Sequence, residues 1–358
     1  MAGVYIHIPF CKSRCRYCDF FSTTLLDLRH AYVEAVLKEA EARRDEIRDI
    51  RTVYLGGGTP SLLTCNDIQR LLKVAHAETA EEVTMEANPG DLTEGTLRQW
   101  SEAGINRLSI GIQSLHDRLL TLIGRRHNAD EARQAVETAQ KAGFDNISVD
   151  LMYGLPTQSM EEWEKDLKEV QGMGVQHLSC YCLSYEEGTP LYGMLERGEV
   201  AETDEDTENA MYDLLCDNAE ANGYEHYEVS NFAKHGFRSL HNSAYWTRTA
   251  YIGLGAGAHS YDGNRTRRAN LCDLGRYMAA PAEAYTTERL TDRDLYNERV
   301  MLALRTKEGL PAEELRQECK AATDNYISRG LLAEADGRIT ATRQGLHILN
   351  MIIEDLMI

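Results

Sequence analysis

Hydrophobic and polar residues follow two alternating patterns through the first half of this chain. Short apolar runs, typical of buried strands, are followed by longer segments in which apolar residues recur every three or four positions, as in amphipathic helices. The predicted strands are residues 4–8, 52–55, 82–87, 107–112, 146–152 and 177–183. The predicted helices between them are residues 28–48, 66–76, 93–103, 129–142 and 159–172.

Strands that alternate with helices in this way predict parallel βα units. About six such units indicate an α/β fold, a partial (β/α)6 barrel of the TIM type. In a parallel barrel, ligands bind at the rim formed by the C-terminal ends of the strands. We therefore expect functional residues directly after the predicted strands.

The second half of the chain has a different pattern. A helix is predicted over residues 204–222 and a strand over 224–229, and further helices over 292–305, 311–319 and 323–329. A hairpin with an Asp336-Gly337 turn follows, and a last helix begins near Thr342. This order predicts a small α+β domain that resembles a winged helix. Without a basic recognition stripe, we expect a lid or docking role for it.

These patterns predict three regions. Residues 1–200 form the barrel with a cysteine-containing loop, residues 201–289 extend the barrel and include a region rich in histidine and aromatic residues, and residues 290–358 form the winged-helix-like domain.

Composition narrows the function classes. The 358 residues carry a net charge of −19, which argues against broad binding to nucleic acid or to anionic membranes. The chain contains neither a long apolar run nor an N-terminal signal pattern, so we expect a cytoplasmic protein without a transmembrane segment. Peripheral contact with a membrane stays open. Six of the nine cysteines are most simply small buried hydrophobic residues in a reducing compartment.

The other three cysteines are Cys11, Cys15 and Cys18, in a loop directly after the first predicted strand. Three thiolates without a fourth nearby suit a [4Fe–4S] cluster in which one iron is left open for another ligand. A zinc site completed by His7 is the alternative, although no second C-x-x-C pair follows. Three unligated cysteines are the other alternative.

The predicted rim carries a glycine-rich turn and a series of polar residues. Residues 56–61 read Gly-Gly-Gly-Thr-Pro-Ser, and glycines there let backbone amides approach an anionic or zwitterionic ligand. A bare tight turn is the simpler interpretation. Glu86, Gln113 and Asp150 lie at strand ends, with Arg125 in a following loop. Each alone fits a helix cap or a salt bridge, but four on one rim indicate a ligand site.

Histidines and aromatic residues are concentrated between residues 224 and 260. The segment 241–246 reads His-Asn-Ser-Ala-Tyr-Trp, and His259 follows a glycine-rich run. A histidine beside aromatic rings can ligate or stack on a flat ring such as a porphyrin. A buried capping histidine in a packing turn is the simpler alternative.

The cysteine spacing, with Tyr17 before the last cysteine, resembles the radical S-adenosylmethionine (SAM) family. The sequence of residues 5–11, Tyr-Ile-His-Ile-Pro-Phe-Cys, resembles that of one branch of this family, the relatives of oxygen-independent coproporphyrinogen oxidase. The resemblance implies that the open iron binds SAM and that an electron donor reduces the cluster. It also implies the SAM-contacting residues, which are Tyr5, Tyr17, Gly57, Gly58, Thr59, Glu86, Gln113, Arg125 and Asp150.

Two features separate the members of this branch. The oxidases carry a further cysteine two residues after the third, where this chain has Phe20. The Cys-Asp-Phe sequence and the His-Asn-x-x-Tyr-Trp motif instead resemble the HemW-type heme chaperones. That resemblance implies heme binding, transfer of heme to client hemoproteins, and His241 as a heme-binding residue.

Several alternatives remain open at this point. His7 or His259 can replace His241 as the iron ligand, and Arg265, Arg267 and Arg268 are candidates to anchor the heme propionates. A radical SAM enzyme acting on a porphyrinogen is the second function, and a zinc-stabilised interaction protein is the third. No residue is assigned a catalytic role, because oxidation of coproporphyrinogen is not the accepted activity of the chaperone family.

Overall fold

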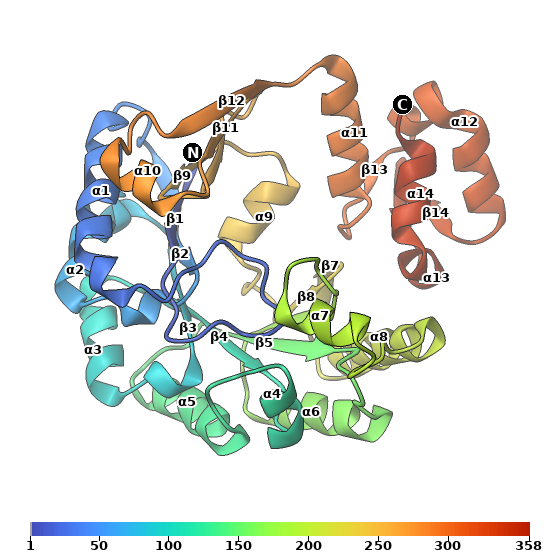
Figure 1. Cartoon of the computed structure of the whole chain (residues 1–358). Helices are drawn as coiled ribbons and strands as arrows, with labels where there is room; N and C mark the ends of the chain where they lie inside the picture. Colours follow the sequence, from blue (N-terminus) through green and yellow to red (C-terminus); the bar gives the residue numbers. More distant parts are fainter. Residues whose placement is uncertain (1) are drawn as a thin grey trace.

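The computed structural model describes residues 2–358 and contains two sheets (Figure 1). The larger sheet has twelve strands in the order β12-β11-β10-β9-β1-β2-β3-β4-β5-β6-β8-β7, and the smaller one has the order β13-β15-β14. The large sheet is open, because β12 and β7 lie at its two edges.

Six consecutive parallel strands form the centre of the large sheet, which confirms the predicted partial barrel. They are β1 (Ala2–Ile8), β2 (Ile50–Gly57), β3 (Glu82–Ala87), β4 (Arg107–Gln113), β5 (Ile147–Tyr153) and β6 (His177–Cys182). The connecting helices cover the outer side of the curved sheet in Figure 1. They are α1 (Arg29–Ala42), α2 (Cys65–Val74), α3 (Glu94–Ala103), α4 (Asp117–Leu122), α5 (Ala129–Lys141) and α6 (Met160–Gly172).

Local sequence explains where these helices begin. Thr93, Asn128 and Ser159 are the N-caps of α3, α5 and α6, and each forms a capping box with the residue three positions later. The inner faces of these helices and the strands share one hydrophobic core, which includes Trp100 and Trp163. Hydrophobic burial therefore holds the helices against the sheet.

The sheet continues beyond the predicted strands on both sides. β9 (Tyr251–Leu254) pairs in parallel with β1, and β10 (His259–Tyr261), β11 (Thr266–Asn270) and β12 (Tyr285–Arg289) follow in antiparallel pairing. On the other side, β8 (Asn231–Ala233) and β7 (Glu225–Glu228) pair antiparallel after β6. The remaining helices of this region are α7 (Pro190–Glu196), α8 (Glu205–Ala221), α9 (Leu240–Trp246) and α10 (Leu274–Ala279).

The glycine-rich run that includes the end of β9 is a packing turn. A Cβ at Gly253 would lie 2.0 Å from the His259 carbonyl oxygen, and Gly255 has a φ of +100°. Only glycine fits where β9 and β10 approach so closely. The run thus allows the sheet to extend past β1.

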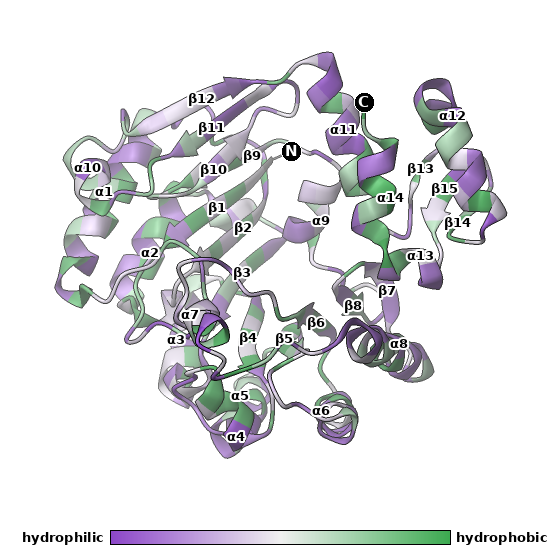
Figure 2. Ribbon diagram, turned by 45° about the vertical axis from the view of Figure 1, so that its right-hand side comes forward, coloured by the Kyte–Doolittle hydropathy of each residue, from purple (hydrophilic) through white to green (hydrophobic). Residues whose placement is uncertain are grey.

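The C-terminal region has its own hydrophobic core and the smaller sheet. Figure 2 shows the hydrophobic stripe of its last helix, whose Ile352 and Leu356 are fully buried. Its elements are α11 (Asp292–Ala303), β13 (Leu310–Pro311), α12 (Ala312–Ser328), β14 (Leu332–Ala335), β15 (Arg338–Ala341), α13 (Arg343–His347) and α14 (Leu349–Leu356).

The helices expected at 311–319 and 323–329 are both present, as the two parts of α12 on either side of non-helical backbone at Cys319 (φ −132°, ψ 44°). The prediction for the last helix needs correction. The last helix does begin after a Thr342 cap, but it is divided into α13 and α14 at Ile348. Among the helices of residues 2–358, none combines the length and the apolar character that crossing a membrane requires.

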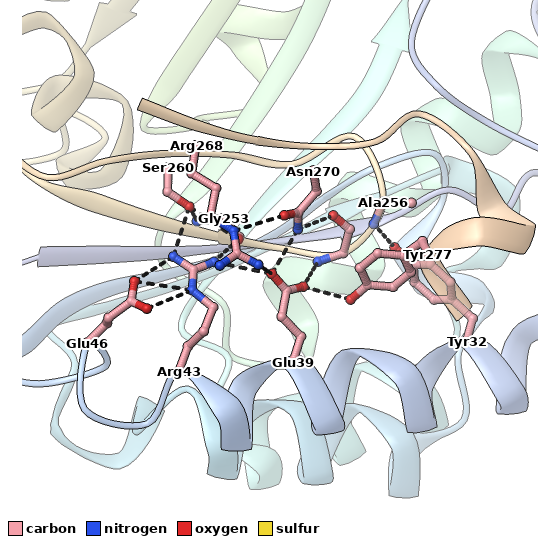
Figure 3. Close-up of polar contacts among 11 residues, drawn as sticks. Tyr32, Glu39, Arg43, Glu46, Gly253, Ala256, Ser260, Arg268, Asn270 and Tyr277 are labelled. Atoms are coloured by element: carbon pink, nitrogen blue, oxygen red, sulfur yellow. Dashed lines mark hydrogen bonds and ion pairs between the residues drawn. The ribbon is translucent and has the colours of Figure 1, made fainter. Parts of the chain in front are cut away.

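A buried carboxylate joins α1 to the extended part of the sheet (Figure 3). Glu39 is fully buried and accepts hydrogen bonds from five donors. Two of them belong to arginines, Arg43 and Arg268, each at 3.2 Å. The other three are the Gly255 amide, the Asn270 side chain and the Tyr277 hydroxyl. Removing one member of such a buried group is costly, because the opposite charge then stays buried without compensation.

Replacing Glu39 by alanine should therefore strongly destabilise the protein. The two guanidinium groups would lose their buried counter-charge, and we expect the free energy of unfolding to fall by about 3–5 kcal/mol. Urea unfolding followed by circular dichroism measures the change. Glu41→Ala, which breaks an exposed pair with Arg44 on the same helix, is the control and should have little effect. Equal effects of the two variants would contradict this role of Glu39.

Candidate functional site

A cavity of about 560 Å³ opens at the C-terminal ends of β2 to β6, where a parallel barrel binds its ligands. All three cysteines of the loop after β1 line it. So do eight of the nine residues expected to contact SAM, namely Tyr17, Gly57, Gly58, Thr59, Glu86, Gln113, Arg125 and Asp150. Tyr5 is not among the lining residues, and its hydroxyl lies 3.0 Å from Nδ1 of His7.

The cysteine loop is tied to the barrel at both ends. The Cys11 amide donates to the Thr23 carbonyl at 2.9 Å, and the Arg16 amide donates to the Ile123 carbonyl at 2.9 Å. Between them, Lys12 forms a 2.8 Å ion pair with the buried carboxylate of Asp91. Asp91 also accepts from Ser61 and Arg126, so it links the loop to the turn after β2 and to the loop after α4.

The donor set fits an iron–sulfur cluster. All three thiols are free and half-buried, and burial raises the pKa of Cys11 and raises that of Cys18 to about 11. Hydrogen-bond donors face two of them: Thr59 Oγ1 lies 3.6 Å from Cys11 Sγ, and Arg125 Nη1 lies 3.4 Å from Cys15 Sγ. Such donors stabilise the thiolate form that iron requires.

The zinc alternative finds less support in this geometry. In the part of the chain that the structure describes, no three His, Cys, Asp or Glu side chains are grouped closely enough to hold one metal ion. A four-iron cluster binds each cysteine to a different iron, so its ligands need not surround one atom. His7 cannot complete a zinc site as it stands, because its ring nitrogens contact the Tyr5 hydroxyl and the Phe21 carbonyl.

The glycine turn lies directly against the cysteine loop. Gly57 has a φ of +109°, and a Cβ there would lie 2.5 Å from the His7 ring. A Cβ at Gly58 would lie 2.8 Å from the carbonyl oxygen of Phe10. The glycines are therefore required for the close approach between this turn and the segment of residues 7–10. The sequence alone allowed either a ligand-binding turn or a bare tight turn at this position.

Three successive strand ends supply the opposite wall. Glu86 of β3 accepts from the Tyr54 hydroxyl (2.8 Å) and the Gly57 amide (3.0 Å). Burial, together with the charge of Asp150, raises the pKa of Glu86 to about 7. Asp150 of β5 accepts from Ser109 at 3.0 Å, and burial raises its pKa as well. Two nearby carboxyl groups of raised pKa favour a ligand that carries hydrogen-bond donors or positive charge.

Unpaired polar atoms also point to a ligand. The Oε1 of Gln113 and the Nε of Arg125 are buried and have no hydrogen-bond partner among residues 2–358. Gln113 also has a φ of +65°, which is unusual for a non-glycine residue, at a β-bulge in β4. Strained and unsatisfied groups at one cavity are typical of a binding site.

Sequence reasoning missed several lining residues. Tyr54, Arg107, Ser109, Tyr181 and Asn242 all line the cavity. Two of them, Arg107 and Ser109, could have been found from the period of two along β4. Residues 107, 109, 111 and 113 lie on the same side of this strand, and all four line the cavity. Asn242 belongs to α9 and carries no comparable signal.

His241 is a buried residue of α9. Its Nδ1 lies 2.8 Å from Thr52 Oγ1, its Nε2 lies 2.9 Å from the Tyr245 hydroxyl, and its ring stacks on Tyr54. Burial lowers the pKa of the imidazole to about 3, so it is neutral. Both ring nitrogens are engaged, and iron ligation would require the loss of one hydrogen bond. Its role in heme binding therefore stays a prediction. His259, by contrast, is exposed at the start of β10.

The three arginines considered as propionate anchors each form an ion pair, and their role in heme binding stays a prediction. Arg265 pairs with Asp292, Arg267 with Glu298 and Arg268 with the buried Glu39. These carboxylates lie far away in the sequence, so the sequence alone did not reveal the pairing.

Comparisons with known proteins show the family to which the chain belongs. The radical SAM superfamily model matches residues 5–170, and the HemN C-terminal domain model matches residues 290–348. The heme chaperone HemW of Lactococcus lactis is 36% identical over 371 residues, covering 99% of this chain and 97% of that protein. The HemW of Bacillus subtilis is 32% identical, covering 98% of each chain.

Among solved structures, the coproporphyrinogen III oxidase HemN of Escherichia coli has a similar fold. The TM-score is 0.83 at 21% identity, and the match covers 99% of this chain and 89% of that chain. At this identity the similarity concerns the fold alone.

The raised pKa of Glu86 predicts a pH dependence of stability. Between the unfolded value of about 4.3 and the folded value of about 7, the folded chain keeps a proton that the unfolded chain has lost. Below about pH 4.3 the neutral carboxyl therefore contributes its full stabilisation of the folded chain. This stabilisation is lost as the pH rises through about 7, where the folded carboxyl ionises. The wild type should lose about 2 kcal/mol relative to Glu86→Gln between about pH 5 and about pH 8.

Urea unfolding of both proteins across this pH range measures the difference. Glu94→Gln, at an exposed position of α3, is the control and should follow the wild type. A constant difference between the wild type and Glu86→Gln at all pH values would show that Glu86 does not titrate in this range.

Proposed function

Because the chain belongs to the HemW family of radical SAM proteins, we propose that it is a heme chaperone that binds heme and transfers it to client hemoproteins. We propose further that it keeps a [4Fe–4S] cluster and a SAM site. The observation that carries the proposal is the 36% identity to a HemW protein across 99% of this chain.

The cavity at the barrel rim supports the cofactor part of this proposal. Cys11, Cys15 and Cys18 would hold three irons of the cluster, which supplies an electron to SAM when it is bound and reduced by a donor. The Gly57-Gly58-Thr59 turn and the carboxyl groups of Glu86 and Asp150 would hold SAM, since they offer close backbone approach and acceptors for its polar groups. Arg125 would orient the thiolate of Cys15.

A radical SAM enzyme that acts on a porphyrinogen is the second candidate function. The eight expected SAM-contacting residues that line the rim cavity favour it, because a protein that only carried heme would not need these residues. Phe20 argues against the oxidase chemistry, because this chain has no thiol two residues after Cys18. Its side chain is 63% exposed beside the cavity.

The cluster assignment predicts a specific effect of losing one thiol. After anaerobic reconstitution with iron and sulfide, the wild type should hold about four irons and Cys15→Ala should lose the broad visible absorbance of the cluster. Cys65→Ala, a half-buried cysteine at the start of α2, is the matched control and should keep it. One tightly bound zinc without sulfide would contradict the assignment.

The two candidate functions predict different results for the reconstituted protein. A chaperone should bind heme, seen as a Soret band that saturates near one heme per chain, and should leave coproporphyrinogen III unchanged in the presence of SAM and a reductant. An oxidase should decarboxylate it, which chromatography of the products detects. Absence of heme binding by the wild type would refute the chaperone proposal.

A further inference from the structure

A second cavity, of about 690 Å³, lies between the barrel and the C-terminal region. Its walls come from β7, α9 and β10 on one side and from α11, β13 and β15 on the other. Figure 1 shows α9 and α11 on the two sides of this space. It shares no lining residue with the cysteine cavity. Its volume is within the range of about 300–1,000 Å³ that is typical of small-molecule sites.

The helix α9 separates the two cavities. Asn242 lines the cysteine cavity, whereas Ser243 and Trp246 line the second one. The start of the helix is held firmly, because the buried carboxylate of Glu82 accepts from the amides of Leu240 and His241 at 2.9 Å each. The His-Asn-x-x-Tyr-Trp segment thus forms a common wall, and a ligand in one cavity leaves the other free.

Positive charge is concentrated around the second cavity, although the whole chain has a net charge of −19. The charged lining residues are one carboxylate, Glu308, and four arginines, Arg238, Arg248, Arg299 and Arg338. Arg238 is occupied by Glu225 and Glu308, and Arg338 donates to two backbone carbonyls. The remaining two arginines are candidates to receive an anion.

Arg248 and Arg299 keep donors for a ligand. Arg299 uses its Nε for Glu314, and within residues 2–358 neither terminal nitrogen has a hydrogen-bond acceptor. Arg248 donates to the Tyr261 hydroxyl through one terminal nitrogen, and its Nε forms a 3.3 Å ion pair with Glu298, so its other terminal nitrogen is the donor left without an acceptor among residues 2–358. Its φ of +54° is unusual for a residue with a side chain. A strained arginine that keeps a terminal donor at a cavity indicates a binding role.

The same cavity offers apolar and aromatic surface. Trp246 is partly exposed to it, and Tyr227, Tyr261 and Leu295 also contribute to its walls. Arginines with aromatic and aliphatic groups suit a flat apolar molecule that carries carboxylates. A phosphate or a small organic acid would leave the apolar part of the lining without a partner.

We propose that this cavity binds the tetrapyrrole, with Arg248 and Arg299 on its two propionates and Trp246 against the macrocycle. This inference rests on the proposed chaperone function and assigns its ligand to a cavity separate from the cluster. No histidine, cysteine or methionine lines the cavity, so its walls supply no nitrogen or sulfur ligand to the iron. Recognition is through the carboxylates and the ring, which permits release to a client without breaking an iron–protein bond.

Three porphyrins test this assignment on the wild-type full chain. Heme and metal-free protoporphyrin IX should bind with affinities within about tenfold of each other, because the iron makes no essential bond. The dimethyl ester of protoporphyrin IX should bind at least about tenfold more weakly, since it cannot form charge-assisted hydrogen bonds. Binding of heme without binding of the metal-free porphyrin, or equal binding of acid and ester, would overturn the assignment.

A matched pair of variants tests the location. Arg248→Gln/Arg299→Gln should bind heme at least about tenfold more weakly than the wild type. Arg44→Gln/Arg316→Gln removes two arginines that do not line the cavity and should bind heme as the wild type does. Circular dichroism and thermal melting confirm that both variants are folded.

The outcomes separate the two proposals. Wild-type affinity in the folded Arg248→Gln/Arg299→Gln variant would refute this cavity while the chaperone function stands. Equal loss in both double variants would mean that overall charge, not this cavity, controls binding. If the wild type binds no heme, the chaperone function itself fails.

Discussion

The contact between the glycine turn and the cysteine loop is the constraint on which the rim cavity depends. No side-chain carbon fits between them, because a Cβ at Gly57 would overlap the His7 ring and one at Gly58 would overlap the Phe10 carbonyl. The contact brings the thiols and the strand ends to one cavity. It also turns the Gly57 amide toward Glu86, so the same residue joins the end of β1, the turn and the acidic wall.

Charge in this acidic protein is organised by buried pairs. Glu39 accepts hydrogen bonds from two arginines inside the protein, and Asp91 accepts hydrogen bonds from Lys12 and Arg126 beside the cysteine loop. The first set fixes α1 against the sheet extension, and the second fixes the loop against the barrel.

Two cavities that share the wall α9 suggest how one chain can combine two tasks. The cysteine cavity has the strained and unsatisfied groups of a cofactor site. The second cavity has arginines that suit the carboxylates of a tetrapyrrole and aromatic rings that suit its macrocycle. His241 belongs to this helix, and its ring bonds to Thr52 of β2 and to Tyr245 of the same helix. In that position it supports the helix between the cavities, so its substitution would affect both.

The sequence by itself determined the six βα units, the cysteine loop and most of the rim. Hydrophobic periodicity is local, and parallel strand ends meet at one edge, so Glu86, Gln113 and Asp150 could be placed together without coordinates. Only the tertiary structure decided the pairing of β9 with β1, the burial of His241 against Thr52, and the capture of Arg268 by Glu39. These partners lie roughly two hundred residues apart, and a local pattern contains no information about which distant segment will provide a strand, an acceptor or a counter-charge.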